Sequence, residues 1–307
     1  MGLTVHFNFR APPGTDAAAA LGHVQALQRF CEDRPFAEVD QEIAHFEGEH
    51  DCDFEAEPPG HPHRWLKVMS RESLRRRETL YHPDDNDLRC GYDVGSRCEI
   101  HYDVKPVEII AFSAWPGEGC ESLELGLARY PATIEFWDYR YARRTRRRML
   151  RTRLAGQWRW GAFCKTQYAS AKGLPHFLRC HLLVIAVLDR ARELGILRHV
   201  SDEGGYWRSR RLDTLGGRVG EYNVFIGAMA KVFKAAVPPN CQLETEIEHH
   251  PDYEQFTIEK LAADFPEMHA AVARTAGLLR RAARDHTPAT APNLDSDPTA
   301  IQPHSAA

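Results

Sequence analysis

The sequence predicts an α+β fold: antiparallel sheet regions with one N-terminal helix and a C-terminal group of two or three packed helices. Before residue 170, apolar residues alternate with polar ones in most segments, which is the period of a half-buried strand; after residue 173 they recur at helical spacing. Strands that follow one another in runs favour an antiparallel sheet. The 307 residues are 43% hydrophobic and carry a net charge of −4, which is typical of a globular protein and excludes one that is cationic throughout.

The N-terminal region, residues 1–95, is predicted to form a β-α-β-β unit. Residues 3–9 are predicted to form a strand, because four apolar side chains at odd positions alternate with more polar ones. Residues 17–31 are predicted to form a helix, since their apolar residues are three or four positions apart. Residues 37–46 and 63–70 are interpreted as two further strands.

The second region, residues 96–285, is predicted to begin with β-hairpins and can share one core with the first. Strand patterns on both sides of a turn at 115–122 predict a hairpin over residues 107–130, because the proline and glycines of that turn suit its backbone conformation. Residues 139–153 and 157–168 are predicted to form another strand pair.

Helices are predicted after the hairpins. Residues 177–197 are apolar nearly all round, which is typical of a buried helix. A second helix is predicted over 212–237, and a third over 257–284 with a break at Pro266. Residues 286–307 contain four prolines and few large apolar groups, so we expect a disordered tail.

The protein is predicted to be cytoplasmic and without membrane contact. Its amino terminus lacks the basic start and apolar stretch of a secretory signal, and its longest strongly apolar run, residues 182–188, is far below the roughly 20 residues that cross a bilayer. None of the eight cysteines belongs to a C-x-x-C pair, so we expect free thiols. His176 and Cys180 are one helical turn apart, but no third ligand is evident; we predict no metal site and no cofactor.

A thiol site is one candidate for catalysis. Cys164 is predicted to lie on a strand and His181 on the next helix, where a nucleophilic cysteine could meet the histidine that forms a thiolate pair with it. In this interpretation Cys164 or Cys120 is the nucleophile, and His181 or a carboxylate is the base. The alternative is core packing, because Cys164 shares its predicted face with two tryptophans. The sequence leaves open whether the protein is an enzyme.

The leading hypothesis is a soluble protein that binds a small molecule or a peptide in a cleft at the junction of sheet and helices. Three polar segments support it: the turn at 115–122, the end of the strand at 157–168, and a loop at 201–207. If the strand order brings them together, they form a cleft with aromatic walls and a few polar groups. The predicted ligand-binding residues are Trp115, Glu118, Cys120, Lys165, Gln167, Tyr168, Asp202, Glu203 and Trp207.

Two blocks of opposite charge lead to two other hypotheses. Residues 35–58 hold nine carboxylates and no lysine or arginine, while residues 140–153 hold eight arginines and no acid. A protein-interaction module could pair these blocks within the chain, in self-association, or with a partner. The arginine-rich segment is also typical of an electrostatic footprint for nucleic acid, but few aromatic residues accompany it, so nucleic-acid binding is the weaker hypothesis.

Three segments resemble a bacterial family whose function is uncharacterised. They are FCKTQYAS at 163–170, FLRCHL at 177–182 and VSDEGGYW at 200–207, and the resemblance spans residues 1–235. It implies a bacterial cytoplasmic protein. It assigns no activity and no residue roles.

Overall fold

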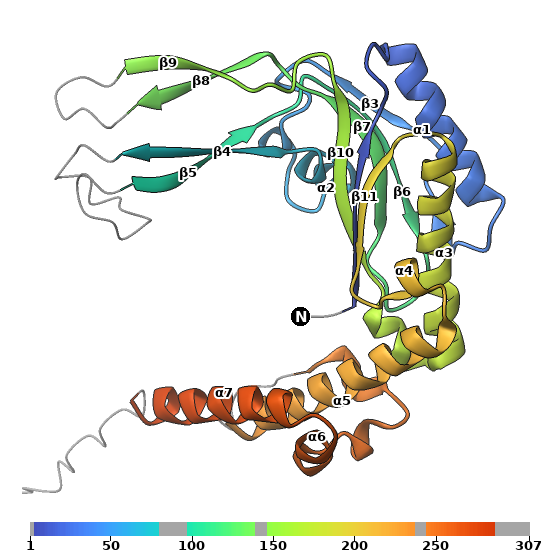
Figure 1. The fold of residues 1–307 in the computed structure, drawn as a ribbon, viewed down its shortest axis with the longest axis vertical. Coiled ribbons are helices and arrows are strands. Elements are labelled where there is room, and N and C mark those ends of the chain that lie inside the picture. Colours follow the sequence, from blue (N-terminus) through green and yellow to red (C-terminus); the bar gives the residue numbers. More distant parts are fainter. Residues whose placement is uncertain (1–2, 80–96, 139–145, 237–243, 286–307) are drawn as a thin grey trace, which may run out of the picture.

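The computed structural model describes residues 3–79, 97–138, 146–236 and 244–285 (Figure 1). It confirms the α+β fold, with antiparallel sheets and several helices. The predicted disordered tail lies outside the described residues. Within the described ranges, no helix combines the length and the apolar composition needed to cross a membrane.

The main sheet is antiparallel and, in the described part of the chain, has seven strands. Its order is β11-β1-β10-β7-β6-β2, and β3 also pairs with β6. The strands are β1 (Thr4–Arg10), β2 (Glu38–Val39), β3 (Ala44–Glu47), β6 (Glu108–Trp115), β7 (Leu123–Arg129), β10 (Trp158–Lys165) and β11 (Leu197–Asp202). Because β1 lies between β10 and β11, strands of residues 1–95 and of residues 96–285 belong to one sheet.

Two helices, α1 (Ala17–Glu32) and α3 (Leu174–Glu193), cover one face of this sheet (Figure 1). Successive side chains of a strand point to opposite faces, so Val5, Phe7 and Phe9 of β1 share one side, where each is at most 1% exposed. They belong to the same apolar cluster as Val24 of α1 and Val184 of α3. Removing these side chains from water stabilises the packing of helices on sheet.

The opposite face carries helix α2 (Pro62–Met69), where a strand is predicted at 63–70 (Figure 1). That prediction is wrong. Pro62 occupies the first helical turn, where its missing N–H costs nothing, and the side chain of His61 accepts a hydrogen bond from the backbone of His63. Leu66 packs into the main apolar cluster, and α2 contacts β6 and β10.

Two ribbons extend from the main sheet: β4 (Glu72–Thr79) pairs with β5 (Arg97–Val104), and β8 (Thr133–Asp138) pairs with β9 (Arg146–Arg151). The predicted pairing of 139–153 with 157–168 is therefore wrong, because β10 pairs with β1 and β7 instead. Alternating hydrophobicity identifies a strand and its faces, but the choice of partner depends on distant parts of the chain.

The C-terminal helices pack around a second apolar cluster, below the sheet in Figure 1. They are α5 (Leu212–Ala236), α6 (Ile258–Asp264) and α7 (Pro266–Asp285), whereas the one-turn helix α4 (Tyr206–Ser209) packs on β11 and the main cluster. Short 3₁₀ turns are η1 (Phe54–Ala56), η2 (Gln167–Lys172), η3 (Glu246–His249) and η4 (Tyr253–Gln255). These bounds confirm the helices predicted at 212–237 and 257–284, with the break at Pro266. The helix predicted at 177–197 is α3, but it ends at Glu193, and Leu197 begins β11.

Candidate functional site

The three polar segments that the sequence singles out meet at one end of the main sheet. The turn after β6 is held against the end of β10, where the Glu121 N–H donates to the Lys165 carbonyl at 2.9 Å. Gly119 lies so close to η2 that a Cβ on it would come within 2.5 Å of the Tyr168 carbonyl. The turn therefore packs directly on residues 165–169.

A buried polar chain connects these residues to the loop after β11. Thr166 Oγ1 lies 2.9 Å from His181 Nδ1, and His181 Nε2 lies 3.4 Å from an oxygen of Asp202. Asp202 also accepts the backbone N–H groups of Gly204 and Trp207, at 2.8 and 2.7 Å. Burial alone would raise the pKa of Asp202, but these contacts hold it below its ordinary value. These contacts among Thr166, His181 and Asp202 fix the loop after β11 to helix α3.

The remaining predicted ligand-binding residues also have partners within the protein. Gln167 accepts the Leu3 N–H at 3.0 Å, and Glu203 accepts the Thr4 N–H at 2.9 Å. The other contacts are Lys165 with Glu121 at 3.0 Å, Glu118 with Lys172 at 2.7 Å, and Trp207 with the guanidinium groups of Arg192 and Arg210. Tyr168 is half-buried. The segments meet in a packed junction.

The two residues predicted as a catalytic pair have separate partners. Cys164 has no exposed surface, and its thiol donates to the Glu121 carbonyl at 3.3 Å. Burial raises the pKa of Cys164 well above its ordinary value, which favours the thiol over the nucleophilic thiolate. The ring nitrogens of His181 face Thr166 and Asp202, so the contacts of both side chains agree with the alternative of core packing.

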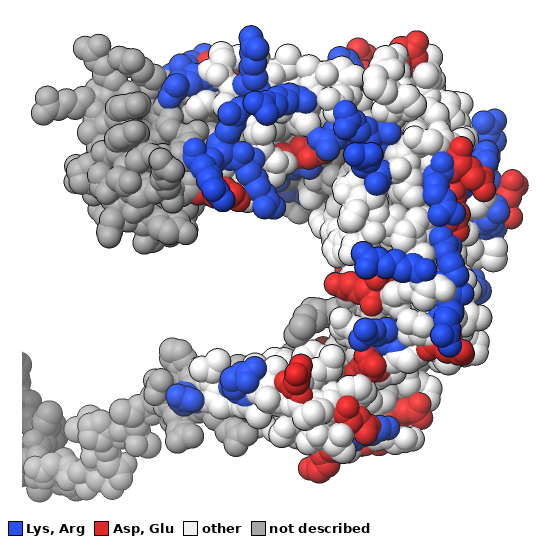
Figure 2. All heavy atoms as spheres, in the orientation of Figure 1, with Lys and Arg blue, Asp and Glu red and all other residues white. Residues whose placement is uncertain are grey.

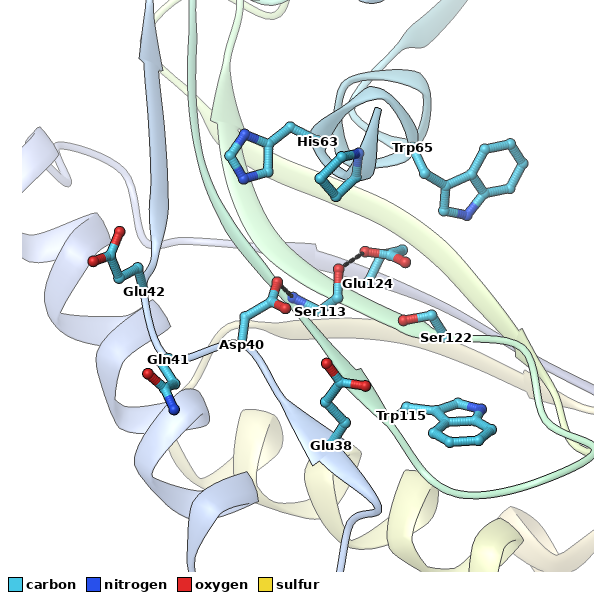
Figure 3. Close-up of a pocket in the computed structure, with 11 residues that line it drawn as sticks. Glu38, Asp40, Gln41, Glu42, His63, Trp65, Ser113, Trp115, Ser122 and Glu124 are labelled. Atoms are coloured by element: carbon cyan, nitrogen blue, oxygen red, sulfur yellow. Dashed lines mark hydrogen bonds between the residues drawn. The ribbon is translucent and has the colours of Figure 1, made fainter. Parts of the chain in front are cut away.

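A cavity of about 600 Å³ lies between α2, β6, β7 and the segment after β2 (Figure 3). Among the predicted ligand-binding residues, Trp115 lines it. The full lining is Glu38, Asp40, Gln41, Glu42, Pro62, His63, Trp65, Ser113, Trp115, Ser122 and Glu124. This volume falls within the range of small-molecule sites.

Strand register brings the polar groups of this cavity together. Ser113 of β6 and Glu124 of β7 are directly opposite in the antiparallel pair, so their side chains share one face, and the Ser113 hydroxyl donates to Glu124 at 2.6 Å. The Ser113 N–H donates to the Asp40 carboxylate at 2.8 Å. Trp115 follows two residues after Ser113 and faces the same side. Two carboxyl groups therefore bind one serine at the base of the cavity.

Glu124 is a buried carboxyl group, with 2% of its surface exposed. Burial raises its pKa to about 7, the hydroxyls of Ser113 and Ser122 counteract that rise, and the charge of Asp40 adds to it. Near neutral pH, Glu124 therefore exists in both its protonated and its ionised form. A positive charge that entered the cavity would favour the ionised form.

Two indole rings form the open wall of the cavity. Trp65 is 48% exposed and Trp115 is 36% exposed, although large aromatic side chains are usually more buried. The indole Nε1 of Trp115 donates to the Cys120 carbonyl at 3.1 Å, which fixes the ring. The lining residues include no lysine or arginine. Carboxylates and exposed indoles both attract cations.

Two features of the sequence point to this site. Glu124 interrupts the apolar run Leu123–Leu127, where an acid is costly unless it has partners. Glu38, Asp40 and Glu42 belong to the nine-carboxylate block, which suggested a charge-pairing surface instead. In the structure, part of that block lines the cavity.

Residues of both charge blocks form ion pairs with residues that lie outside the two blocks. Lysine and arginine side chains gather over the ribbons in Figure 2, and there Arg147 of β9 lies 3.2 Å from Glu135 of β8. In the acidic block, Glu57 pairs with Lys67 at 2.6 Å. Residues 139–145 of the arginine-rich segment lie outside the described residues. Pairing with a partner or with nucleic acid stays a prediction.

Comparisons of the chain with protein-family models, with curated proteins and with solved structures give no match. A function for the protein is therefore inferred from the side chains that line the cavity.

Proposed function

We propose that the protein binds an organic cation in this cavity, either a small amine or guanidinium compound or the basic side chain of a peptide. The observation that carries the proposal is the composition of the lining: it contains the buried carboxyl of Glu124, three further acids and two exposed indoles, but no lysine or arginine. The cavity is large enough for a ligand of this class.

Each part of the lining has a role in binding. Glu38 and Glu42 are exposed and attract cations toward the opening. Trp65 and Trp115 present indole faces, on which an ammonium or guanidinium group is stabilised by about 0.5–2 kcal/mol. Glu124, at the base, releases its proton when a cation arrives, so the ligand charge is matched by a new carboxylate.

A neutral sugar is the main alternative ligand, because paired carboxyl groups and exposed aromatic rings also occur in carbohydrate sites. Charge distinguishes the two ligands: the four acids of the lining, with no lysine or arginine beside them, attract a cation more strongly than a neutral sugar. We therefore favour the cation.

Spermidine is a suitable probe, since it has several ammonium groups on a slender chain. We expect calorimetry at pH 8 to show that it binds, and that maltotriose, a neutral comparison, does not. Glu124→Gln should weaken spermidine at least about tenfold, because a buried carboxylate partner is lost. Trp65→Ala should weaken it about fivefold, because an indole face is lost.

The control for Glu124→Gln is Glu254→Gln, whose carboxyl is 93% exposed and away from the cavity. The control for Trp65→Ala is Met149→Ala, which removes another exposed apolar side chain. Both controls should bind spermidine as the wild type does. Equal losses in controls and cavity variants, or binding of maltotriose without spermidine, would refute the proposal.

We also infer a cytoplasmic location for this binding function. The described cysteines Cys31, Cys52, Cys120, Cys164 and Cys180 are all free thiols. Free thiols are typical of reducing compartments, which supports this inference.

A further inference from the structure

The thiols of Cys120 and Cys180 lie together under the turn that follows β6. Cys120 lies in this turn, where its N–H donates to the Gly117 carbonyl at 3.0 Å, and its side chain packs against the apolar cluster that contains Cys180. The Cys180 sulfur lies 3.8 Å from the guanidinium Nη2 of Arg179, 3.7 Å from Nε2 of His176 and 3.5 Å from the Pro116 carbonyl oxygen. The side chains of this cluster are two thiols, one guanidinium and one imidazole, and none of them lines the cation cavity, although the Cys120 carbonyl accepts the indole N–H of Trp115.

The local fold explains why these groups meet. His176, Arg179 and Cys180 are three to four residues apart in the first turns of α3, so they share one side of the helix. The turn crosses them at Gly117, where a Cβ would come within 2.9 Å of Arg179 Nη2 and 3.1 Å of the Cys180 sulfur. Its φ of +147° also favours glycine. The absence of a side chain at Gly117 lets the turn bring Cys120 to Cys180.

The cluster separates the protonation states of the two thiols. The hydrogen bond from Cys120 and the charges of His176 and Arg179 lower the pKa of Cys180 to about 6, against the effect of burial. The hydrogen bond to Cys180, together with burial, raises the pKa of Cys120. Both shifts favour the thiolate at Cys180 and the protonated thiol at Cys120. A thiolate beside a protonated thiol is the arrangement that redox-active cysteine pairs use.

We propose that Cys180 and Cys120 form an oxidisable dithiol that reduces a small hydroperoxide and closes to a disulfide. The Cys180 thiolate attacks the outer oxygen of hydrogen peroxide, so that an S–O bond forms, the O–O bond breaks, and hydroxide leaves. The Cys120 sulfur then attacks the resulting sulfenic acid, an S–S bond forms, and the thiol proton leaves with the hydroxyl as water. The two thiols lose two electrons, and the peroxide gains them.

Burial restricts which oxidant can take part. Cys180 has no exposed surface, and Cys120 is only partly exposed, so a bulky disulfide cannot reach the attacking sulfur without opening the turn. Hydrogen peroxide is close to water in size, so it needs a much smaller opening than a disulfide does. Cys31 and Cys52 are also buried, but burial raises the pKa of each to about 12, so they stay protonated and react slowly with peroxide. Their oxidation rates are therefore internal controls for the rate at Cys180.

The test is peptide mapping of the full-length protein after treatment with hydrogen peroxide and alkylation of the remaining thiols. Digestion with trypsin and Glu-C separates Cys180, in the peptide at 180–190, from Cys120 and from Cys164. We expect a 120–180 disulfide that forms at least about ten times faster than Cys31 or Cys52 is oxidised. Dithiothreitol should restore both thiols. A second arm with oxidised glutathione should leave the pair reduced.

Two variants test whether Cys180 is the attacking thiol and Cys120 the thiol that closes the disulfide. In Cys120→Ser the sulfenic acid of Cys180 should persist and be captured by dimedone, whereas Cys180→Ser should give neither sulfenic acid nor disulfide at Cys120. A disulfide between Cys164 and Cys180, or oxidation of Cys180 no faster than that of Cys31 in the wild type, would overturn the proposal. None of these readouts depends on ligand binding in the cation cavity.

Discussion

The variant Glu124→Gln is expected to gain about 3 kcal/mol of stability relative to the wild type when the pH rises from 4.5 to 8. The folded-state pKa of Glu124 is raised to about 7, against an ordinary value of 4.5. Between these values only the folded wild type holds the proton, so its free energy of unfolding falls as the pH increases. Glutamine resembles the protonated carboxyl and does not titrate. Urea denaturation of both proteins across this range measures the difference.

The sign of this effect distinguishes a buried carboxyl group from one in an ion pair. A carboxyl group whose pKa is lowered by folding would make the wild type more stable as the pH rises. The exposed control Glu254→Gln should keep a constant difference from the wild type across the range. Parallel pH profiles for Glu124→Gln and the wild type would show that Glu124 is ionised in the folded protein well below pH 7.

Asp202→Ala is expected to lower the free energy of unfolding by about 2–4 kcal/mol at pH 7, because buried and partly buried N–H groups lose their acceptor. The variant leaves His181 Nε2 without its charged neighbour and the N–H groups of Gly204 and Trp207 without their acceptor. A Cβ at Gly204 would crowd the same groups, because it would come within 2.6 Å of Leu215 Cδ1 and 3.0 Å of the Asp202 carboxylate. Chemical denaturation measures the loss.

Asp213→Ala is the matched control, because the Asp213 side chain is 92% exposed and should change stability by no more than about 0.5 kcal/mol. The lowered pKa of Asp202 gives the stabilisation a pH dependence as well: it is present above the unfolded pKa and is lost as the pH falls through the folded one. Equal stabilities of Asp202→Ala and Asp213→Ala would mean that the chain from Thr166 to Asp202 does not hold the loop.

The parts of the fold that depend on local pattern were predictable. The alternating apolar and polar residues at 3–9 form strand β1, because successive side chains of any strand point to opposite faces of the sheet. The hairpin at 107–130 was predictable because both strands and their turn are adjacent in the chain. The strand predicted at 63–70 is a helix, since eight residues with mixed spacing fit either period and Pro62 decides between them.

The site was harder to predict, because it depends on how deeply each side chain is buried and on contacts between residues that are far apart in the sequence. The polar segments at 115–122, 165–168 and 201–207 do meet, but hydrogen bonds such as that from Leu3 to Gln167 fill their junction. No local pattern distinguishes such a junction from an open cleft. Glu124 becomes a buried, titrating group only because Ser113 lies opposite it and α2 packs on the same sheet.

The most direct test of the cation site is the number of protons released when spermidine binds. Calorimetry at pH 7 in two buffers of different ionisation enthalpy gives this number. Since the pKa of Glu124 is about 7, the wild type should release about half a proton more per spermidine than Glu124→Gln does. Equal proton release by the two proteins, with spermidine bound to both, would contradict a site in which Glu124 meets the ligand charge.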